Sequence, residues 1–271
     1  MGRTSEHDTE AGDPPGSPSR EAPLKGRRGC WVNLFEPIVG ELVGRAGYDY
    51  ALLDMEHSPV TFDRLVPMVR AVQLGGARAL VRAPDADPAW IGRLMDLGAD
   101  GAMVPRVASA AEAGRIARAA EYAPEGTRGM AASIVRASGW GTDPDYLAHC
   151  RERFLLMLQI ETREAVEAAG DIARVDGVDA VFIGPYDLSG SLGHTARPDH
   201  AVTRAAIDTV VRAVREAGKP LSTLPTPEVD AAALFERGFD LVFSGSDLTM
   251  LREAMVRDVS TPISRRPLGS A

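Results

Sequence analysis

Short apolar runs alternate with amphipathic stretches along most of this chain, and that alternation constrains the fold more than any other feature. The runs are bounded by glycine or charged residues, and continuous apolar runs of this length are typical of strands that are buried on both faces. We count eight of them, at residues 29–34, 49–54, 77–82, 100–104, 154–160, 180–184, 219–224 and 240–244.

The stretches between these runs have helical spacing. One helix is expected to begin at Thr61 and to end at Gly75-Gly76, and Ser109 is expected to cap another. Eight strand–helix units within 271 residues predict an α/β fold, a (β/α)8 TIM barrel. A doubly wound open sheet is the alternative, but such a sheet usually has a glycine-rich dinucleotide turn after its first strand, and this sequence has none there.

The two ends of the chain differ from its middle. Residues 1–28 are rich in proline, glycine, serine and charge, so we expect a disordered N-terminal tail, followed by a barrel domain at 29–260 and a C-terminal tail at 261–271. No apolar stretch reaches the roughly 18 residues of a membrane helix. Glu36 and Glu41 interrupt the first apolar stretch, which argues against a signal peptide. We therefore expect a cytoplasmic protein with no membrane partner.

Composition narrows the partners further. The net charge is −8, and no block of lysine and arginine occurs beyond the first 30 residues, which argues against a nucleic-acid-binding surface. The two cysteines, Cys30 and Cys150, are far apart, and buried thiols in a reducing compartment are expected rather than a disulfide.

One interval breaks the regular alternation. Residues 122–152 form a long segment that is rich in glycine, arginine and small residues, and long irregular segments inside a domain tend to be functional. Arg128 and Arg136 could attract an anionic substrate. The alternative is a lid or a segment at an oligomer interface, and the sequence does not choose between them.

Carboxylates follow two neighbouring predicted strands. Glu161 follows the fifth run and Asp187 the sixth, so both are expected at the rim where α/β barrels carry their chemistry. Mg²⁺ and Mn²⁺ typically take one or two carboxylates and complete their coordination with water and substrate oxygens. The pair therefore predicts a site for a hard divalent cation, although each acid alone could also cap a helix.

Two further strand ends carry polar groups. Arg82 ends the third run, where its planar guanidinium could hold a carboxylate or a developing oxyanion, or could simply form a structural salt bridge. His57 follows the second run, with Asp54 three residues before it. An acid that orients the imidazole would make His57 a general base near neutral pH. The alternative for His57 is a helix-capping role.

Together these segments resemble the HpcH/HpaI aldolase family, the metal-dependent (class II) pyruvate aldolases. The resemblance covers nearly all of residues 29–257 and is strongest at Gln159-Ile-Glu161 and at Phe182-Ile-Gly-Pro-Tyr-Asp-Leu-Ser-Gly-Ser-Leu-Gly193. It also includes Tyr48-Asp-Tyr-Ala-Leu-Leu-Asp-Met-Glu-His57. It implies a TIM barrel of the phosphoenolpyruvate/pyruvate-binding type.

The resemblance also implies roles for individual residues. Glu161 and Asp187 would ligate one divalent cation (Mg²⁺, Mn²⁺ or Co²⁺), and Glu56 would lie near its water shell. Arg82 would contact the keto oxygen of the substrate, and His57, paired with Asp54, would serve acid–base catalysis. The residues expected to contact substrate are Gln159, Gly184, Pro185, Tyr186, Trp31 and Leu224. For Trp31 and Leu224, a place in the barrel core is the alternative.

The activity implied is reversible cleavage of a 4-hydroxy-2-oxo acid into pyruvate and an aldehyde, through a metal-stabilised pyruvate enolate. Family members are usually homo-oligomers, here expected to be a trimer or hexamer, with a C-terminal helix at 246–257 exchanged between neighbours. Alternatives are an oxaloacetate decarboxylase or another enolate-trapping enzyme, an acyl-CoA lyase, and a non-catalytic binding barrel. A phosphate-binding isomerase is a further one, because Phe243-Ser-Gly-Ser-Asp247 resembles an anion cradle.

Overall fold

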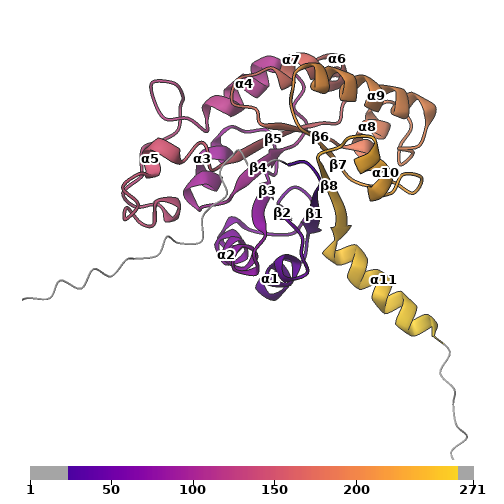
Figure 1. Cartoon of the computed structure of the whole chain (residues 1–271), viewed down its shortest axis with the longest axis horizontal. Coiled ribbons are helices and arrows are strands. Elements are labelled where there is room, and N and C mark those ends of the chain that lie inside the picture. Colours follow the sequence, from indigo (N-terminus) through magenta and orange to yellow (C-terminus); the bar gives the residue numbers. More distant parts are fainter. Residues whose placement is uncertain (1–23, 262–271) are drawn as a thin grey trace, which may run out of the picture.

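Eight parallel strands form a closed barrel in the computed structural model, which describes residues 24–261 (Figure 1). The strands pair in chain order, and β8 closes the barrel against β1. They are β1 (Arg27–Val32), β2 (Tyr50–Asp54), β3 (Arg78–Arg82), β4 (Gly101–Val104), β5 (Leu155–Ile160), β6 (Ala180–Ile183), β7 (Leu221–Thr223) and β8 (Leu241–Ser246). The predicted TIM barrel is confirmed.

The apolar runs are continuous because most strands are buried on both faces. Every residue of β2, β4, β5 and β6 is buried. Side chains such as Leu52, Met157 and Phe182 pack together in one cluster inside the barrel. Leu53, Leu156 and Val181 belong to the clusters between the strands and the surrounding helices. Parallel sheets covered on both faces show this continuous pattern rather than an alternating one.

Helices follow most of the strands. They are α1 (Pro37–Arg45), α2 (Leu65–Gly75), α3 (Ala89–Asp96), α4 (Ala110–Arg118), α5 (Tyr146–His149), α6 (Arg163–Glu167), α7 (Ala169–Ala173), α8 (Pro185–Ser191), α9 (Ala201–Glu216), α10 (Ala231–Glu236) and α11 (Asp247–Ser260), with 3₁₀ turns η1 (Phe62–Arg64) and η2 (Arg136–Ser138). Ser109 caps α4 as expected, because its hydroxyl accepts the Glu112 N–H at 3.2 Å. The helix expected after Thr61 starts as η1 and continues as α2, which ends at Gly75 and is capped by Gly76 with φ +97°.

The N-terminal boundary lies earlier than expected. Strand β1 starts at Arg27 rather than at residue 29, and Leu24 is already buried. The remainder of the two expected tails, residues 1–23 and 262–271, lies outside the described residues. Cys30 and Cys150 are buried free thiols, as expected. Among the described residues, no helix is both long and apolar enough to cross a membrane.

The 122–152 segment lies at the end of the barrel opposite the rim. Arg128 donates to Asp96, at the C-terminal end of α3, at 2.6 Å, and to the Tyr146 hydroxyl. Arg136 donates to the carbonyls of Leu97 and Gly98, which lead into the amino end of β4. Arg128 and Arg136 were expected to attract an anionic substrate. Their guanidinium groups tie the segment to the end of the barrel opposite the rim, so neither arginine lies at the rim.

Candidate active site

A pocket of about 170 Å³ opens at the carboxyl ends of the strands. It is lined by Trp31, His57, Arg82, Gln159, Phe182, Gly184, Pro185, Tyr186, Asp187 and Leu224. All of these except Phe182 are residues that the sequence proposed for the site. Asp54, Glu56 and Glu161 contact this set directly, so the fold brings the whole predicted constellation together at one rim.

Asp54, at the end of β2, organises one side of the pocket. Its two oxygens accept hydrogen bonds from Arg82 at 2.8 and 2.7 Å, and one also accepts from Trp31 at 3.2 Å and Asn33 at 3.0 Å. Burial alone would raise the pKa of Asp54, but the hydrogen bonds and charge of Arg82 hold it below its usual value. Asp54 is therefore an anion that fixes the guanidinium of the neighbouring strand.

Arg82 meets a second acid on its other side. Its Nη1 lies 2.9 Å from a carboxylate oxygen of Glu56, and its guanidinium lies over the Trp31 ring, 4.6 Å from the ring centroid. The side chain is only 6% exposed. Since two acids and one aromatic face hold the planar group, its orientation toward the pocket is set before any substrate arrives.

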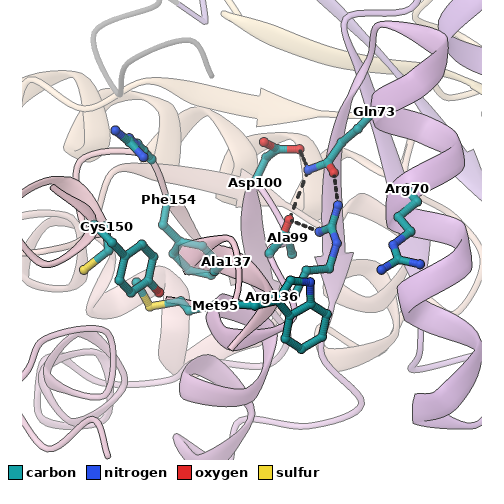
Figure 2. Close-up of a pocket in the computed structure, with 13 residues that line it drawn as sticks. Arg70, Gln73, Met95, Ala99, Asp100, Arg136, Ala137, Cys150 and Phe154 are labelled. Carbon is teal, nitrogen blue, oxygen red and sulfur yellow. Dashed lines mark hydrogen bonds between the residues drawn. The ribbon is translucent and has the colours of Figure 1, made fainter. Parts of the chain in front are cut away.

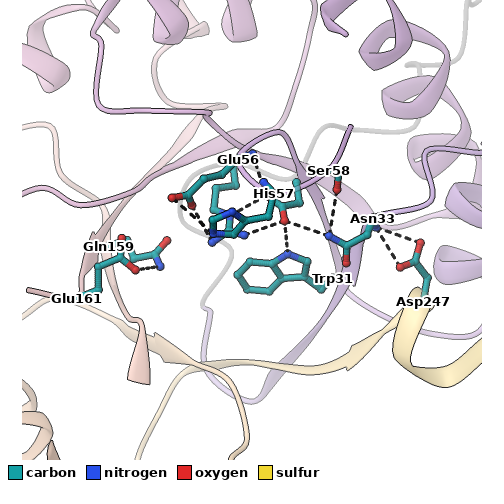
Figure 3. A network of polar contacts seen from close by, with 10 residues as sticks. Trp31, Asn33, Glu56, His57, Ser58, Gln159, Glu161 and Asp247 are labelled. Carbon is teal, nitrogen blue, oxygen red and sulfur yellow. Dashed lines mark hydrogen bonds and ion pairs between the residues drawn. The ribbon is translucent and has the colours of Figure 1, made fainter. Parts of the chain in front are cut away.

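The expected Asp54–His57 pair is wrong in its detail. Asp54 accepts the backbone N–H of His57, at 3.4 Å, and not its ring. The imidazole Nε2 instead lies 3.7 Å from Glu56 (Figure 3). The His57 side chain lines the pocket and is 62% exposed. The physical reason is that Arg82, Trp31 and Asn33 already occupy the Asp54 oxygens. Glu56 is the acid beside the imidazole.

Glu161 follows the last residue of β5, lies against Gln159 and is nearly fully buried. One of its oxygens accepts the Arg106 N–H at 2.8 Å, and the other accepts from the Gln159 side-chain amide. Arg106 has a left-handed backbone (φ +58°), which turns its N–H toward the acid. Burial, together with the negative charges of Asp187 and Glu56, raises the pKa of Glu161 to about 8. Around Glu161, the negative charges of Asp187 and Glu56 therefore have a larger effect than the positive charge of Arg82.

The donor set fits a hard divalent cation. The Gln159 side-chain oxygen is buried without a hydrogen-bond partner in the described part of the chain. A Cβ at Gly184 would lie 2.6 Å from a Glu161 oxygen, so the glycine keeps the space beside that acid open. No group of three His, Cys, Asp or Glu side chains that could hold a metal occurs within residues 24–261. Glu161 and the exposed Asp187 would therefore need water and substrate oxygens to complete a coordination shell.

Two residues of this network were missed by the sequence reasoning. Asn33 donates its side-chain amide to Asp54 and Ser58, and its backbone N–H to Asp247 (Figure 3). Asn33 lay inside a predicted strand, but β1 ends at Val32, so a polar residue near the end of that run was the available signal. Asp247 also accepts the Leu34 N–H at 3.0 Å. Asp247 is the last residue of the segment 243–247 that resembles an anion cradle. Its negative charge disfavours a bound phosphate there.

Fold and site together define an α/β-barrel enzyme with buried acids and a fixed arginine at the rim. The chain belongs to the HpcH/HpaI aldolase/citrate lyase family, whose model matches residues 27–254. The resemblance inferred from the sequence is confirmed.

Relatives support the same assignment. The chain is 36% identical over 234 residues to a hydroxypyruvate/pyruvate aldolase of Chromohalobacter salexigens, covering 86% of this chain and 92% of the relative. It is 38% identical over 223 residues to a 4-hydroxy-2-oxo-heptane-1,7-dioate aldolase of Klebsiella pneumoniae, covering 82% and 84%. Among solved structures, an HpcH/HpaI aldolase from Desulfitobacterium hafniense superposes with a TM-score of 0.81 at 31% identity, covering 91% and 96%.

Proposed function

We propose that this protein is a metal-dependent pyruvate aldolase that reversibly cleaves a 4-hydroxy-2-oxo acid to pyruvate and an aldehyde. The observation that carries the proposal is the buried Glu161, held by Gln159 and the Arg106 N–H next to a rim pocket that Asp187 and the fixed Arg82 line. The relatives named above are aldolases, in agreement with this class of reaction.

Glu161 and Asp187 are the residues that would hold the cation. When bound, a divalent cation would act as a Lewis acid that polarises the keto group of a 2-oxo acid and makes its methyl protons more acidic. Gln159, hydrogen-bonded to Glu161, would keep that carboxylate in one orientation. Glu56 would accept hydrogen bonds from water in the same part of the pocket.

Arg82 would bind the keto oxygen of the substrate and stabilise the negative charge that develops on it. Because Asp54 and Glu56 already hold the guanidinium, little reorganisation is needed during the reaction. The first-turn N–H groups of α8, at Tyr186 and Asp187, are suited to the substrate carboxylate. Leu224 would contact the aldehyde, and Trp31 would pack against the bound substrate.

His57 would move the proton. Its imidazole stands at the pocket mouth, where Nε2 could take a proton from the pyruvate methyl group directly or from an intervening water, and return it in the reverse direction. The nearby Glu56 would stabilise the protonated ring, since the two groups are 3.7 Å apart. This role does not need the Asp54 contact that the sequence suggested.

The test is an assay of pyruvate release from a panel of 4-hydroxy-2-oxo acids, with oxaloacetate offered separately. Release should be lost after EDTA treatment and should return with Mg²⁺, Mn²⁺ or Co²⁺. Full activity in EDTA would contradict the proposal, and turnover of oxaloacetate alone would assign the site to decarboxylation instead.

We also infer that the protein works as a homo-oligomer, a trimer or hexamer, in which α11 packs on a neighbouring copy. The helix extends away from the barrel (Figure 1). It exposes Leu248, Met250, Leu251, Met255, Val256 and Val259. So many apolar side chains exposed to water on one helix are unfavourable, so a partner surface should cover them. Light scattering should give a multiple of the chain mass for the wild type and a smaller mass for a Leu251→Asp, Val256→Asp variant.

A further inference from the structure

A second pocket, of about 350 Å³, lies at the end of the barrel opposite the rim (Figure 2). The residues that matter for its chemistry are Arg70, Gln73, Asp100, Arg136, Trp140 and Arg153. Asp100 immediately precedes β4, and Arg153 lies two residues before β5. The pocket is therefore separate from the active site, and none of its residues has a role in the proposed reaction.

The lining is cationic in a protein whose net charge is −8. Arg153 is paired with Asp143 at 2.9 Å. Arg70, exposed on α2, has no acidic partner within ion-pair distance among the residues that the structure describes. Asp100 is the acid in the lining, and one of its two oxygens accepts hydrogen bonds from the Gln73 amide at 3.0 Å and the Ala79 N–H at 2.7 Å. Positive charge that is not balanced locally favours an anionic ligand.

Arg136 is held in place before any ligand binds. Its Nη1 donates to the Leu97 carbonyl at 2.8 Å. Its Nη2 donates to the Gln73 side-chain oxygen at 2.9 Å (Figure 2). Burial, and after it the charge of Arg70, lowers the pKa of Arg136, while the charge of Asp100 opposes this shift. An anion between the two arginines would remove their mutual repulsion.

Trp140 adds an aromatic face to the same pocket. Its side chain is 61% exposed, and its backbone is left-handed (φ +63°), between Gly139 and Gly141, which are also left-handed. A bulky residue rarely adopts this conformation, so the turn must be held by its surroundings, including the Trp140 N–H bonded to the Val135 carbonyl at 3.0 Å. The indole lines the pocket, where it can pack against a planar group.

We propose that this pocket binds a small planar organic anion, whose carboxylate or phosphate pairs with Arg70 and Arg136 and whose ring packs on Trp140. The volume is within the range of small-molecule sites. Charge alone would admit inorganic phosphate, so the aromatic face is what selects a planar ligand.

Isothermal titration calorimetry on the full chain tests this with matched probes. Benzoate and phenyl phosphate carry the planar ring, cyclohexanecarboxylate carries the same charge as benzoate without it, and inorganic phosphate carries charge alone. Wild-type protein should bind benzoate or phenyl phosphate at least about tenfold more tightly than the other two probes. Which of the two planar probes binds better identifies the preferred anionic group.

Variants locate the binding. Arg70→Gln and Trp140→Leu should each weaken binding about tenfold or more, whereas Arg212→Gln, an exposed arginine on α9, should leave it unchanged. Arg70 is exposed, so its loss should not disturb folding, unlike the loss of Arg136. Asp187→Asn should bind the probes as wild type does, which separates this site from the active site. Absence of binding by wild type, or equal affinity in Arg70→Gln, would overturn the proposal.

Discussion

At the scale of single residues, the acids of the rim differ in how well hydrogen-bond donors and positive charges compensate their negative charge. Asp54 accepts hydrogen bonds from Arg82, Trp31 and Asn33, and its pKa is lowered. Glu161 accepts from one backbone N–H and one amide, faces two other acids, and has a raised pKa. The contrast separates a structural acid, which positions Arg82, from an acid suited to a cation.

The raised pKa of Glu161 makes a prediction about stability. In metal-free protein the unfolded chain loses this proton near pH 4.5 and the folded chain only near pH 8, so the free energy of unfolding should fall as pH rises between these values. The slope from this group is at most about 1.4 kcal/mol per pH unit. Urea titrations of wild type and Glu161→Gln should therefore converge at the acid end of the window and diverge at the alkaline end. Parallel curves would show that Glu161 titrates normally.

His57 should be dispensable for cation binding but not for proton transfer. Replacing it by alanine removes the imidazole at the pocket mouth and leaves Glu161 and Asp187 in place. Exchange of pyruvate methyl protons in D₂O, followed by NMR with Mg²⁺ present, should slow by about 100-fold or more. His149→Ala, at an exposed position of α5, is the matched control and should exchange at the wild-type rate. Undiminished exchange in His57→Ala would assign the proton to another group.

Between elements, glycines allow α1 and α2 to approach closely. A Cβ at Gly44 would lie 2.5 Å from the backbone of Gly75, and one at Gly75 would lie 2.4 Å from the Glu41 carbonyl oxygen. No side chain can give way at these contacts, because backbone meets backbone. The two helices cover β2 and β3, whose ends carry Asp54 and Arg82, so their separation would also disturb the site.

The prediction at this scale compares two alanine substitutions. Gly44→Ala should destabilise the protein by about 2 kcal/mol or more, since overpacking forces the helices apart. Gly114→Ala, within α4 and with open space around it, should be neutral or should stabilise by about 0.5–1 kcal/mol through higher helix propensity. Thermal and denaturant unfolding of both variants measure this. Equal stability would mean that α1 and α2 can shift apart at no cost.

The sequence predicted elements better than contacts between them. All eight strands were located to within a few residues, because burial on both faces leaves a continuous apolar run. Spacing along the chain was a less reliable guide to which side chains contact one another. Asp54 and His57 are three residues apart, but Asp54 turns to Arg82, which is adjacent across the β2–β3 pair. The contact between Asn33 and Asp247 spans 214 residues and depends on barrel closure, which no local pattern shows.

Over the whole molecule, the two ends of the barrel carry opposite chemistry. Acids gather at the rim around Glu161, whereas arginines gather around Asp100 at the other end. The 122–152 segment belongs to the second end, which the sequence could not show, because its direction depends on how Arg128 and Arg136 dock on α3 and the amino end of β4. Membership of the HpcH/HpaI family supports an aldolase-type reaction. We expect the pocket wall around Tyr186 and Leu224 to select among aldehydes.

The cation at the rim is the central claim, and titration with Mn²⁺ followed by electron paramagnetic resonance tests it most directly. Wild-type protein should bind one ion per chain, and Glu161→Gln and Asp187→Asn should each weaken binding by about 100-fold or more, since each removes a charged oxygen ligand. Glu164→Gln, an exposed acid on the neighbouring α6, should bind as wild type does. Failure of the wild type to bind Mn²⁺, or unchanged affinity in both rim variants, would contradict the claim.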